Sequence, residues 1–571
     1  MKTERVDDIP LLLSQMEKMG IAEVIDETIT THGHWQGLSM GKVVMVWLSY
    51  ILSQGDHRKS HVEDWVAERL SSLSSCLDEE VRALDFSDDR LSDILGVLSI
   101  EKVWAACERG LNQRTVRVYN LRPKIIRIDT TTASSYGSVD EEGMLQFGYS
   151  KDHRPDLPQV KIASSTLDPL GMPVVTTVVA GEKADDPLYL AAVAQVRERL
   201  GARGLLYVGD SKMGALATRA GIAAGGDYYL CPLGKAQLPD AQLSAYLEAA
   251  LAQAEAAVRG VKREDAAGEE EVIAEGFELE VSCSFKREDG SEFHWTERRL
   301  LVRSYAQAEA AEERLMKNLA QAQAELAELS RRRRGKSPVR TLETLTSKAD
   351  DIVTSYGVKG LLSVRAEEQK QQQRVRGYGG KPARIEVTSS FQVLVEVAEG
   401  ALTKAKERLG WRVFVSNQDA ALLPLEKAVR VYRNNYLHEH GYSRLKGRPL
   451  SLTPLYLQRD DQIIGLVHLL SIALRVLTAM EFVLRQSLAK HREQLAGLYA
   501  GNPKRKTARP RTELLLAAFA NITLTMIIVA DEIIYHLTEL SALQRSILQL
   551  IGFDETVFTR LAKHSVQLAK L

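Results

Sequence analysis

The stretch IIRIDTTT, residues 125–132, decides the fold, because it is the first strand-like run after a long series of helical patterns. It is followed by LQFGY at residues 145–149, VKIASSTLD at 160–168, a Pro-Leu-Gly turn at 169–171, and PVVTTVVAG at 173–181. Short runs rich in β-branched residues and bounded by turn residues are typical of β-strands. Their order along the chain predicts three strands in an antiparallel meander.

Helical and strand-like segments alternate directly after the meander. A helical pattern over residues 187–200 leads to GLLYVGD at 204–210, and a second helical pattern over 213–224 leads to DYYLCPL at 227–233. Strands alternating with helices predict β-α-β units and parallel strand pairing. An antiparallel start that passes into such units is the order of the ribonuclease-H-like fold. We therefore predict a mixed-sheet core of the α+β or α/β class.

Outward from this core, the sequence divides into five predicted segments. The strand-like runs FQVLVEVAE (391–399) and WRVFVSN (411–417), with a long helix over about 425–445, are assigned to a second part of the core. The segments are a helical N-terminal domain for DNA-end binding or dimerisation (1–115), the first part of the core (120–235), an inserted subdomain of helices and a β-hairpin (236–385), the second part of the core (386–450), and a helical C-terminal region (451–571).

Composition limits the class of protein. The 571 residues include 74 Lys and Arg against 75 Asp and Glu, which excludes a uniformly basic protein but leaves room for local basic surfaces. With 45% hydrophobic and 26% charged residues, the chain is globular. Its four scattered cysteines and the absence of a signal-peptide pattern favour the cytoplasm. Two apolar stretches, 463–484 and 514–530, are predicted to be core helices, so no membrane contact is expected.

Two aspartates are placed where chemistry is often found. In IIRIDTTT, strand alternation puts Asp129 on the face opposite Ile126 and Ile128, and a carboxylate inside a central strand needs a partner such as a metal ion. The alternative is an aspartate that only hydrogen-bonds the threonines at 130–132. Asp210 ends an apolar strand at its carboxyl end, where α/β sheets place their active sites. The alternative is a helix N-cap.

A third carboxylate lies on the predicted long helix. Helical steps of three, four and seven residues put Tyr432, Tyr436, Glu439, Ser443 and Lys446 on one face. An ordinary amphipathic helix would fill this stripe with aliphatic residues. The alternative is a solvated face with a pair of tyrosines packed inward.

Together these three carboxylates predict a metal-dependent phosphodiester chemistry. Asp129, Asp210 and Glu439 could hold two divalent ions, one activating a water or a DNA 3'-OH and the other stabilising the leaving oxygen. Carboxylate oxygens favour Mg²⁺ or Mn²⁺.

At these residues the sequence resembles bacterial insertion-sequence transposases of the DDE type, in the group with a Tyr-x2-Arg-x3-Glu-x6-Lys signature. Tyr432, Glu439 and Lys446 fall on the signature's spacing, whereas Asn435 occupies the arginine position. The other matching segments are 125–132, GYSKDHRPDLPQV (148–160), LLYVGDSKM (205–213), LKGRPLSLTPLYL (445–457) and IIGLVHLLSIALRV (463–476).

The resemblance implies a role for each matching residue. Asp129, Asp210 and Glu439 would be both the catalytic residues and the ligands of two Mg²⁺ or Mn²⁺ ions. Because Asn435 replaces the signature arginine, its phosphate contact would pass to Arg433 or Arg444. The complete set of expected DNA contacts is Tyr432, Arg433, Arg444, Lys446, Lys151 and Arg154.

Three basic clusters lie where a path for DNA would need them, although each could instead be a solvated charge run. The clusters are Arg331 to Arg334 with Lys336 and Arg340, Arg374 and Arg376, and Lys504 to Lys506 with Arg509 and Arg511.

The predicted function is a DNA transposase that cleaves the ends of an insertion sequence and joins them to target DNA. The expected partner is double-stranded DNA, both the terminal inverted repeats and the target. A homodimer on DNA and a cytoplasmic, nucleoid-associated location are also expected. The alternatives are a catalytically silent DNA-binding protein of transposase ancestry and a ribonuclease-H-like nuclease that cuts without joining.

Overall fold

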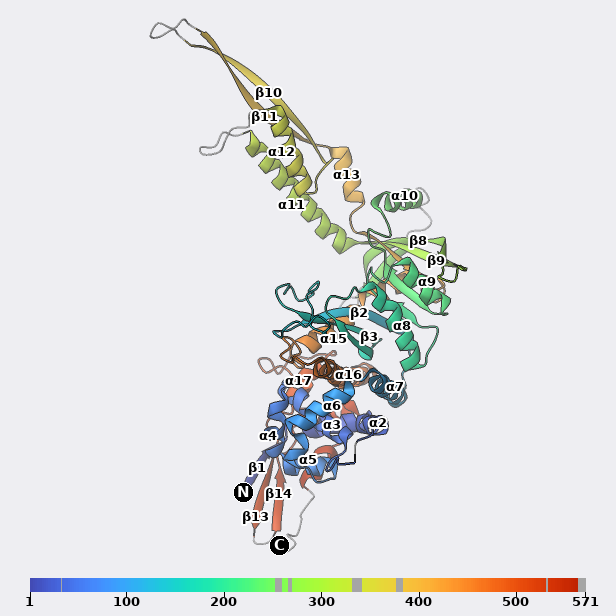
Figure 1. Cartoon of the computed structure of the whole chain (residues 1–571), viewed down its shortest axis with the longest axis vertical. Helices are drawn as coiled ribbons and strands as arrows, with labels where there is room; N and C mark the ends of the chain where they lie inside the picture. Colours follow the sequence, from blue (N-terminus) through green and yellow to red (C-terminus); the bar gives the residue numbers. More distant parts are fainter. Residues whose placement is uncertain are drawn as a thin grey trace.

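The protein is elongated, with a mixed β-sheet between a helical body and a projecting arm (Figure 1). The computed structural model describes residues 1–31, 33–251, 259–264, 270–330, 341–375, 384–529 and 532–562. Both described ends of the chain lie in the helical body, at the opposite end of the molecule from the arm.

The central sheet has nine strands in the order β4-β3-β2-β5-β6-β12-β9-β8-β7. The first three form the predicted antiparallel meander, and β2, β5 and β6 are parallel neighbours. Their bounds are β2 (Ile125–Ser134), β3 (Gln159–Leu167), β4 (Met172–Ala180), β5 (Leu206–Val208), β6 (Tyr228–Pro232), β7 (Arg259–Glu264), β8 (Glu270–Lys286), β9 (Glu292–Ser304) and β12 (Trp411–Ser416). The chain is thus of the mixed α/β kind that the sequence predicts.

Strand alternation places each face of this sheet against a different set of helices. Ile126 and Ile128 of β2 pack into a cluster with Tyr189 of α8 (Asp186–Leu200), whereas Leu206 and Val208 of β5 face a second cluster. Helices α9 (Leu216–Ala224) and α14 (Leu425–Arg433) complete the layers. The run LQFGY forms no strand, since only Gln146 makes a single bridge, to Gln159.

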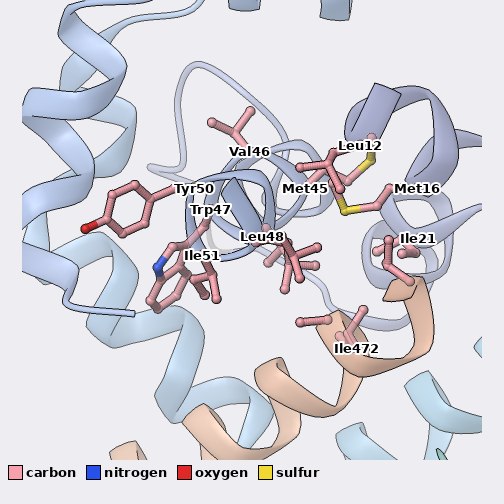
Figure 2. Close-up of a cluster of buried hydrophobic side chains, with 14 of the residues drawn as sticks. Leu12, Met16, Ile21, Met45, Val46, Trp47, Leu48, Tyr50, Ile51 and Ile472 are labelled. Atoms are coloured by element: carbon pink, nitrogen blue, oxygen red, sulfur yellow. The ribbon is translucent and has the colours of Figure 1, made fainter. Parts of the chain in front are cut away.

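Helices from both ends of the sequence share one hydrophobic core in the body. Figure 2 shows Trp47, Leu48 and Ile51 of α3 close to Ile472 of α16. These helices are α1 (Ile9–Lys18), α2 (Ile21–Thr28), α3 (Met40–Gln54), α4 (Val62–Ala67), α5 (Leu70–Leu77), α6 (Asp88–Leu98), α7 (Glu101–Val118), α16 (Asp460–His491), α17 (Thr512–Ala517), α18 (Ala542–Ile551) and α19 (Thr556–Thr559). The N- and C-terminal regions therefore fold as one unit.

Helix α16 runs through the middle of this body. Within the described residues it is the one helix long and apolar enough to cross a membrane, but 94% of its most apolar window is buried inside the protein. At Gly465, an added Cβ would lie 2.1 Å from the carbonyl oxygen of Leu95, so α16 and α6 touch backbone to backbone. Close packing on α6 is the behaviour of a core helix, as the sequence predicts for residues 463–484.

The C-terminal region is not wholly helical, and this expectation was wrong. The described part of the apolar stretch, residues 514–529, divides between α17 and a strand, β13 (Thr523–Val529), which pairs with β14 (Glu532–Leu537). The first strand of the chain, β1 (Lys2–Arg5), pairs with the other edge of β13. An apolar run of this length fits a helix or a strand by periodicity, and its β-branched residues favour the strand.

The inserted segment has two parts. After α10 (Asp240–Leu251), strands β7 to β9 extend the central sheet. The projecting arm is built from a two-stranded sheet with its own small core, formed by α11 (Tyr305–Leu329), α12 (Leu342–Ser355), β10 (Leu362–Val375) and β11 (Arg384–Val397), and is followed by α13 (Glu399–Glu407). The run FQVLVEVAE belongs to β11 and pairs with β10, so its assignment to the core sheet was wrong.

A buried charge cluster joins the sheet to the helical body. Glu108 of α7 forms ion pairs with Arg199 of α8 and, at 3.5 Å, with Arg475 of α16, and it accepts the backbone N–H of Thr176 of β4 at 2.9 Å. The three charged side chains are at most 1% exposed. Arg475 also donates to Asn112 Oδ1 at 2.7 Å. Four elements therefore depend on one carboxylate.

Replacing Glu108 by Gln should lower the free energy of unfolding by about 3–5 kcal/mol, because the buried Arg475 would lose its counter-charge and Arg199 would keep only its ion pair with Glu101. Equilibrium urea unfolding followed by tryptophan fluorescence measures the change. Glu198→Gln is the matched control, since Glu198 pairs with Arg109 at the surface and its loss should cost less than about 1 kcal/mol. Equal effects of the two changes would contradict the assigned role of the buried cluster.

Candidate functional site

Asp129 and Asp210 lie side by side at the centre of the sheet. Strands β2 and β5 are parallel, and their pairing ends with Arg127 opposite Val208, so Asp129 and Asp210 each lie two residues beyond the last paired position. Burial raises the pKa of Asp129, nearby Lys151 opposes the shift, and Asp210 adds to it. The two aspartates therefore interact electrostatically, as expected for carboxylates that share one site.

Tyr189 of α8 orients the second aspartate. Its hydroxyl donates a hydrogen bond of 2.6 Å to Asp210 Oδ1, and the same oxygen accepts the backbone N–H of Lys212 at 2.9 Å. Burial raises the pKa of Tyr189, and the charges of Asp210, Asp129 and Asp185 raise it further. The phenol thus stays protonated and acts as a hydrogen-bond donor.

Asp185 is a buried member of the site. It immediately precedes α8, is 5% exposed, and forms ion pairs of 2.7 Å with Lys161 of β3 and 2.6 Å with Lys212. Burial alone would raise its pKa, but the two ammonium groups hold the pKa of Asp185 at about 2. Because Lys212 also contacts Asp210 through its backbone, Asp185 anchors the loop after β5. The buried Lys161, in a strand otherwise lacking charge, was the available signal.

The segment 148–160 brings further charges to the carboxylates. Lys151 Nζ lies 2.7 Å from Thr130 Oγ1 and 3.5 Å from Asp129 Oδ1. Lys446, at the end of α15 (Tyr436–Lys446), pairs with Asp152 at 2.6 Å. Arg154 makes two hydrogen bonds, of 2.8 and 2.7 Å, to Asp156. Each of these three predicted DNA contacts thus has an acidic neighbour.

The predicted long helix over 425–445 is two helices. Helix α14 ends at Arg433 and α15 begins at Tyr436, with a turn at Asn434 and Asn435 between them. Tyr432 therefore does not share a continuous helical stripe with Glu439. Asparagine favours turns because its side chain competes for backbone hydrogen bonds, which explains the break.

The two predicted DNA contacts of α14 lie differently. The Tyr432 ring packs on Phe414 with the ring centroids 4.6 Å apart. Burial raises the pKa of Tyr432 to about 12, and Asp210 and Asp129 contribute to the rise, so the ring lies near the carboxylates. Arg433 is exposed and donates to Ser304 Oγ at 3.2 Å.

Glu439 is exposed on the first turn of α15, close to where this helix is attached to the sheet. Tyr442, one turn further on the same face, donates its hydroxyl to the backbone oxygen of Asp129 at 2.6 Å. His438 is hydrogen-bonded to Thr166 of β3 at 2.9 Å. Glu439 thus lies one helical turn from a residue that contacts Asp129.

The prediction that Arg444 contacts DNA is contradicted by the structure. Arg444 is 3% exposed, and its guanidinium binds Glu481 of α16 and Glu513 of α17, the latter with distances of 2.6 and 3.0 Å. A buried guanidinium that already binds two carboxylates is not positioned to contact a DNA phosphate at the surface. Arg444 instead fastens α15 to the helical body.

Asp129 on β2 and Asp210 after β5 offer carboxylate oxygens, which are the ligands that a hard divalent cation prefers. Among the described residues, no group of three or more His, Cys, Asp or Glu side chains lies close enough to hold a metal ion. The structure therefore brings Asp129 and Asp210 together and leaves the carboxylate of Glu439 outside the group.

Comparison with known proteins adds little to this geometry. No family model matches the chain, and no curated protein matches it. A solved structure described as the cryo-EM structure of a piggyBac transposase synaptic complex with hairpin DNA is similar at 11% identity and a TM-score of 0.23. The match covers 50% of this chain and 57% of that chain, little more than half of its length. A similarity of this size carries no argument about function.

Replacing Asp185 by Asn should lower the free energy of unfolding at pH 7 by about 3–5 kcal/mol, because two lysines would lose their buried counter-charge. The pKa of Asp185 is lowered from 3.8 to about 2, so its stabilisation is present above pH 4 and is lost as the pH falls toward 2. The difference in the free energy of unfolding between Asp185→Asn and the unchanged protein should therefore become smaller as the pH falls from 4 toward 2.

Asp186→Asn is the matched control for this prediction, because Asp186 is the exposed first residue of α8. Its loss should cost less than about 1 kcal/mol, the size of a helix-dipole effect. Urea unfolding at several pH values measures both variants, and a pH-independent loss in Asp185→Asn would contradict the assignment.

Proposed function

We propose that the protein is a DNA transposase that cuts phosphodiester bonds at the ends of a mobile element and joins the freed ends to target DNA. The observation that carries the proposal is the position of Asp129 on β2 and of Asp210 just after the parallel neighbour β5, with the helix that bears Glu439 hydrogen-bonded to β2 at Asp129. The sequence resemblance to DDE transposases rests on the same residues.

The sheet supports the finer assignment to the ribonuclease-H-like fold. Its first five strands lie in the order β4-β3-β2-β5-β6, with an antiparallel meander followed by two parallel pairings. The next strand, β12, is antiparallel to β6. In chain order, Asp129 belongs to the first strand of this core and Asp210 follows the fourth.

The proposed cofactor is Mg²⁺ or Mn²⁺, as two ions held by Asp129, Asp210 and Glu439. When bound, the ions would supply an activated oxygen nucleophile and charge stabilisation for the leaving oxygen. The chain's own residues prepare the site: Tyr189 orients Asp210, and Lys151 balances the charge of Asp129. The proposal requires Glu439 to move toward the aspartate pair when DNA and metal bind.

The proposed partner is double-stranded DNA, both the terminal repeats and the target. Lys446 ends α15, the helix that carries Glu439, and Arg433 ends the preceding helix, α14. We expect these two cations to hold phosphates on either side of the reacting bond. Cutting at two element ends makes a homodimer on DNA the natural assembly. The nucleoid is the proposed location.

Asp129→Asn and Asp210→Asn should each lower the rate of Mg²⁺-dependent strand cleavage by about 1000-fold, which corresponds to roughly 4 kcal/mol of transition-state stabilisation. Binding to the same DNA should persist. The substrate is linear DNA carrying the sequences that flank the coding region, and labelled products are resolved on denaturing gels.

Asp186→Asn, in the exposed aspartate at the start of α8, should cleave at the rate of the unchanged protein. Unaltered cleavage by Asp129→Asn would refute the proposal. Cleavage without joined products would instead identify a nuclease, and binding without cleavage by the unchanged protein would identify a DNA-binding protein that has no catalysis.

A further inference from the structure

An arginine-lined cleft lies where the last turn of α3, the turn after α15 and the loop before α17 meet. Its volume is about 660 Å³. The four arginines that line it are Arg448, Arg505, Arg509 and Arg511. Three of them belong to the basic cluster that the sequence indicated in the C-terminal region, and Arg448 comes from a distant part of the chain. The fold has therefore gathered these charges.

The positive charge of this arginine cleft is not balanced within the protein. All four side chains are exposed, and none forms an ion pair with a residue in the described ranges. The acid that lines the cleft, Glu513, is already bound to Arg444. Four like charges held close together repel one another, which costs free energy unless an anion binds.

The loop that carries three of the arginines has a fixed conformation. Leu495 and Thr507 exchange two backbone hydrogen bonds of 2.9 and 3.0 Å, and the N–H of Gly497 donates to the Pro503 carbonyl at 3.0 Å. The Arg505 guanidinium stacks over Tyr499, 4.1 Å from the ring centre. Side chains on such a loop lose little conformational freedom on binding.

The arginine cleft adjoins the end of α15. This helix ends at Lys446, Gly447 follows it in an extended conformation, and Arg448 lines the cleft two residues beyond the helix. The same helix carries Glu439 and is hydrogen-bonded to Asp129 through Tyr442. A duplex bound at the cleft would therefore lie against the end of the helix that contacts the candidate site.

We propose that the arginine cleft binds the phosphate backbone of duplex DNA at the end of α15. That this DNA is also the substrate of the candidate site rests on the function proposed above, whereas binding of duplex DNA does not. Guanidinium groups bind phosphates with two parallel hydrogen bonds, so arginine suits this role better than lysine. The contacts are with the backbone and are independent of base sequence.

The test is the salt dependence of binding to a 30-base-pair duplex of arbitrary sequence. Arg505→Gln/Arg509→Gln in the full chain should lower the slope of log Kd against log [KCl] by about 1.8, because each lost phosphate contact removes about 0.9. Fluorescence anisotropy measures Kd between 50 and 300 mM KCl. The affinity at low salt should fall at least tenfold.

Arg117→Gln/Arg122→Gln is the matched control, since it removes two exposed arginines outside the cleft and changes the net charge equally. Its slope should match that of the unchanged protein. The Arg505→Lys/Arg509→Lys variant keeps both positive charges and should keep most of the slope. This result would show that changes at these two positions leave the loop folded.

An equal loss of slope in both glutamine pairs, or no loss in the cleft variant, would overturn the proposal. Stabilisation of the protein by inorganic phosphate alone, with an unchanged slope on DNA, would assign the cleft to a small anion and also overturn it. Because the assay measures binding, its result is independent of the cleavage test. If the glutamine variant lowers the salt dependence of DNA binding but the unchanged protein never cleaves DNA, the proposed role of the cleft is supported and the proposed transposase activity is refuted.

Discussion

The carboxylate of Glu108 is the interaction on which the arrangement of sheet and helices depends. It lies where α7, α8, β4 and α16 meet, and it balances the charges of Arg199 and Arg475 away from solvent. A charge buried in this way is stable only while its partners hold their positions. The network therefore fixes the helical body against the edge of the sheet, and through α8 it fixes the position of Tyr189.

In the candidate site, too, ion pairs balance charges inside the protein, but the charged side chains are less completely buried. Asp185 holds Lys161 and Lys212, Lys212 holds the loop of Asp210, and Lys151 lies against Asp129. Three lysines thus offset the mutual repulsion of three aspartates. The arrangement lets two carboxylates remain adjacent at the centre of a sheet, where uncompensated charges would be costly. It also leaves Lys151 as the charge that a bound cation would have to displace.

The sequence was most informative where patterns are local. The meander, the parallel strands and the adjacency of Asp129 and Asp210 follow from short apolar runs and their order. The apolar stretch that contains β13 is predicted as a helix, because the periodicity of a short apolar run does not distinguish a helix from a strand. The strand forms by pairing with β1, which lies more than 500 residues away in the sequence. The burial of Arg444 depends on two acids from other helices, which no local pattern reveals.

The position of β12 has a consequence for the order of folding. Val415 pairs with Cys231 on one side and with Arg299 on the other, so this strand closes a sheet whose remaining strands precede it in the chain. The loop that separates β6 from β12 contains the entire arm. During synthesis the arm is complete before the strand that closes the central sheet leaves the ribosome. Contacts between residues so distant in sequence form slowly, because closing a long loop costs entropy before any contact repays it. The arm is therefore free to fold first on its own small core, and closing the sheet around the carboxylates is a late step.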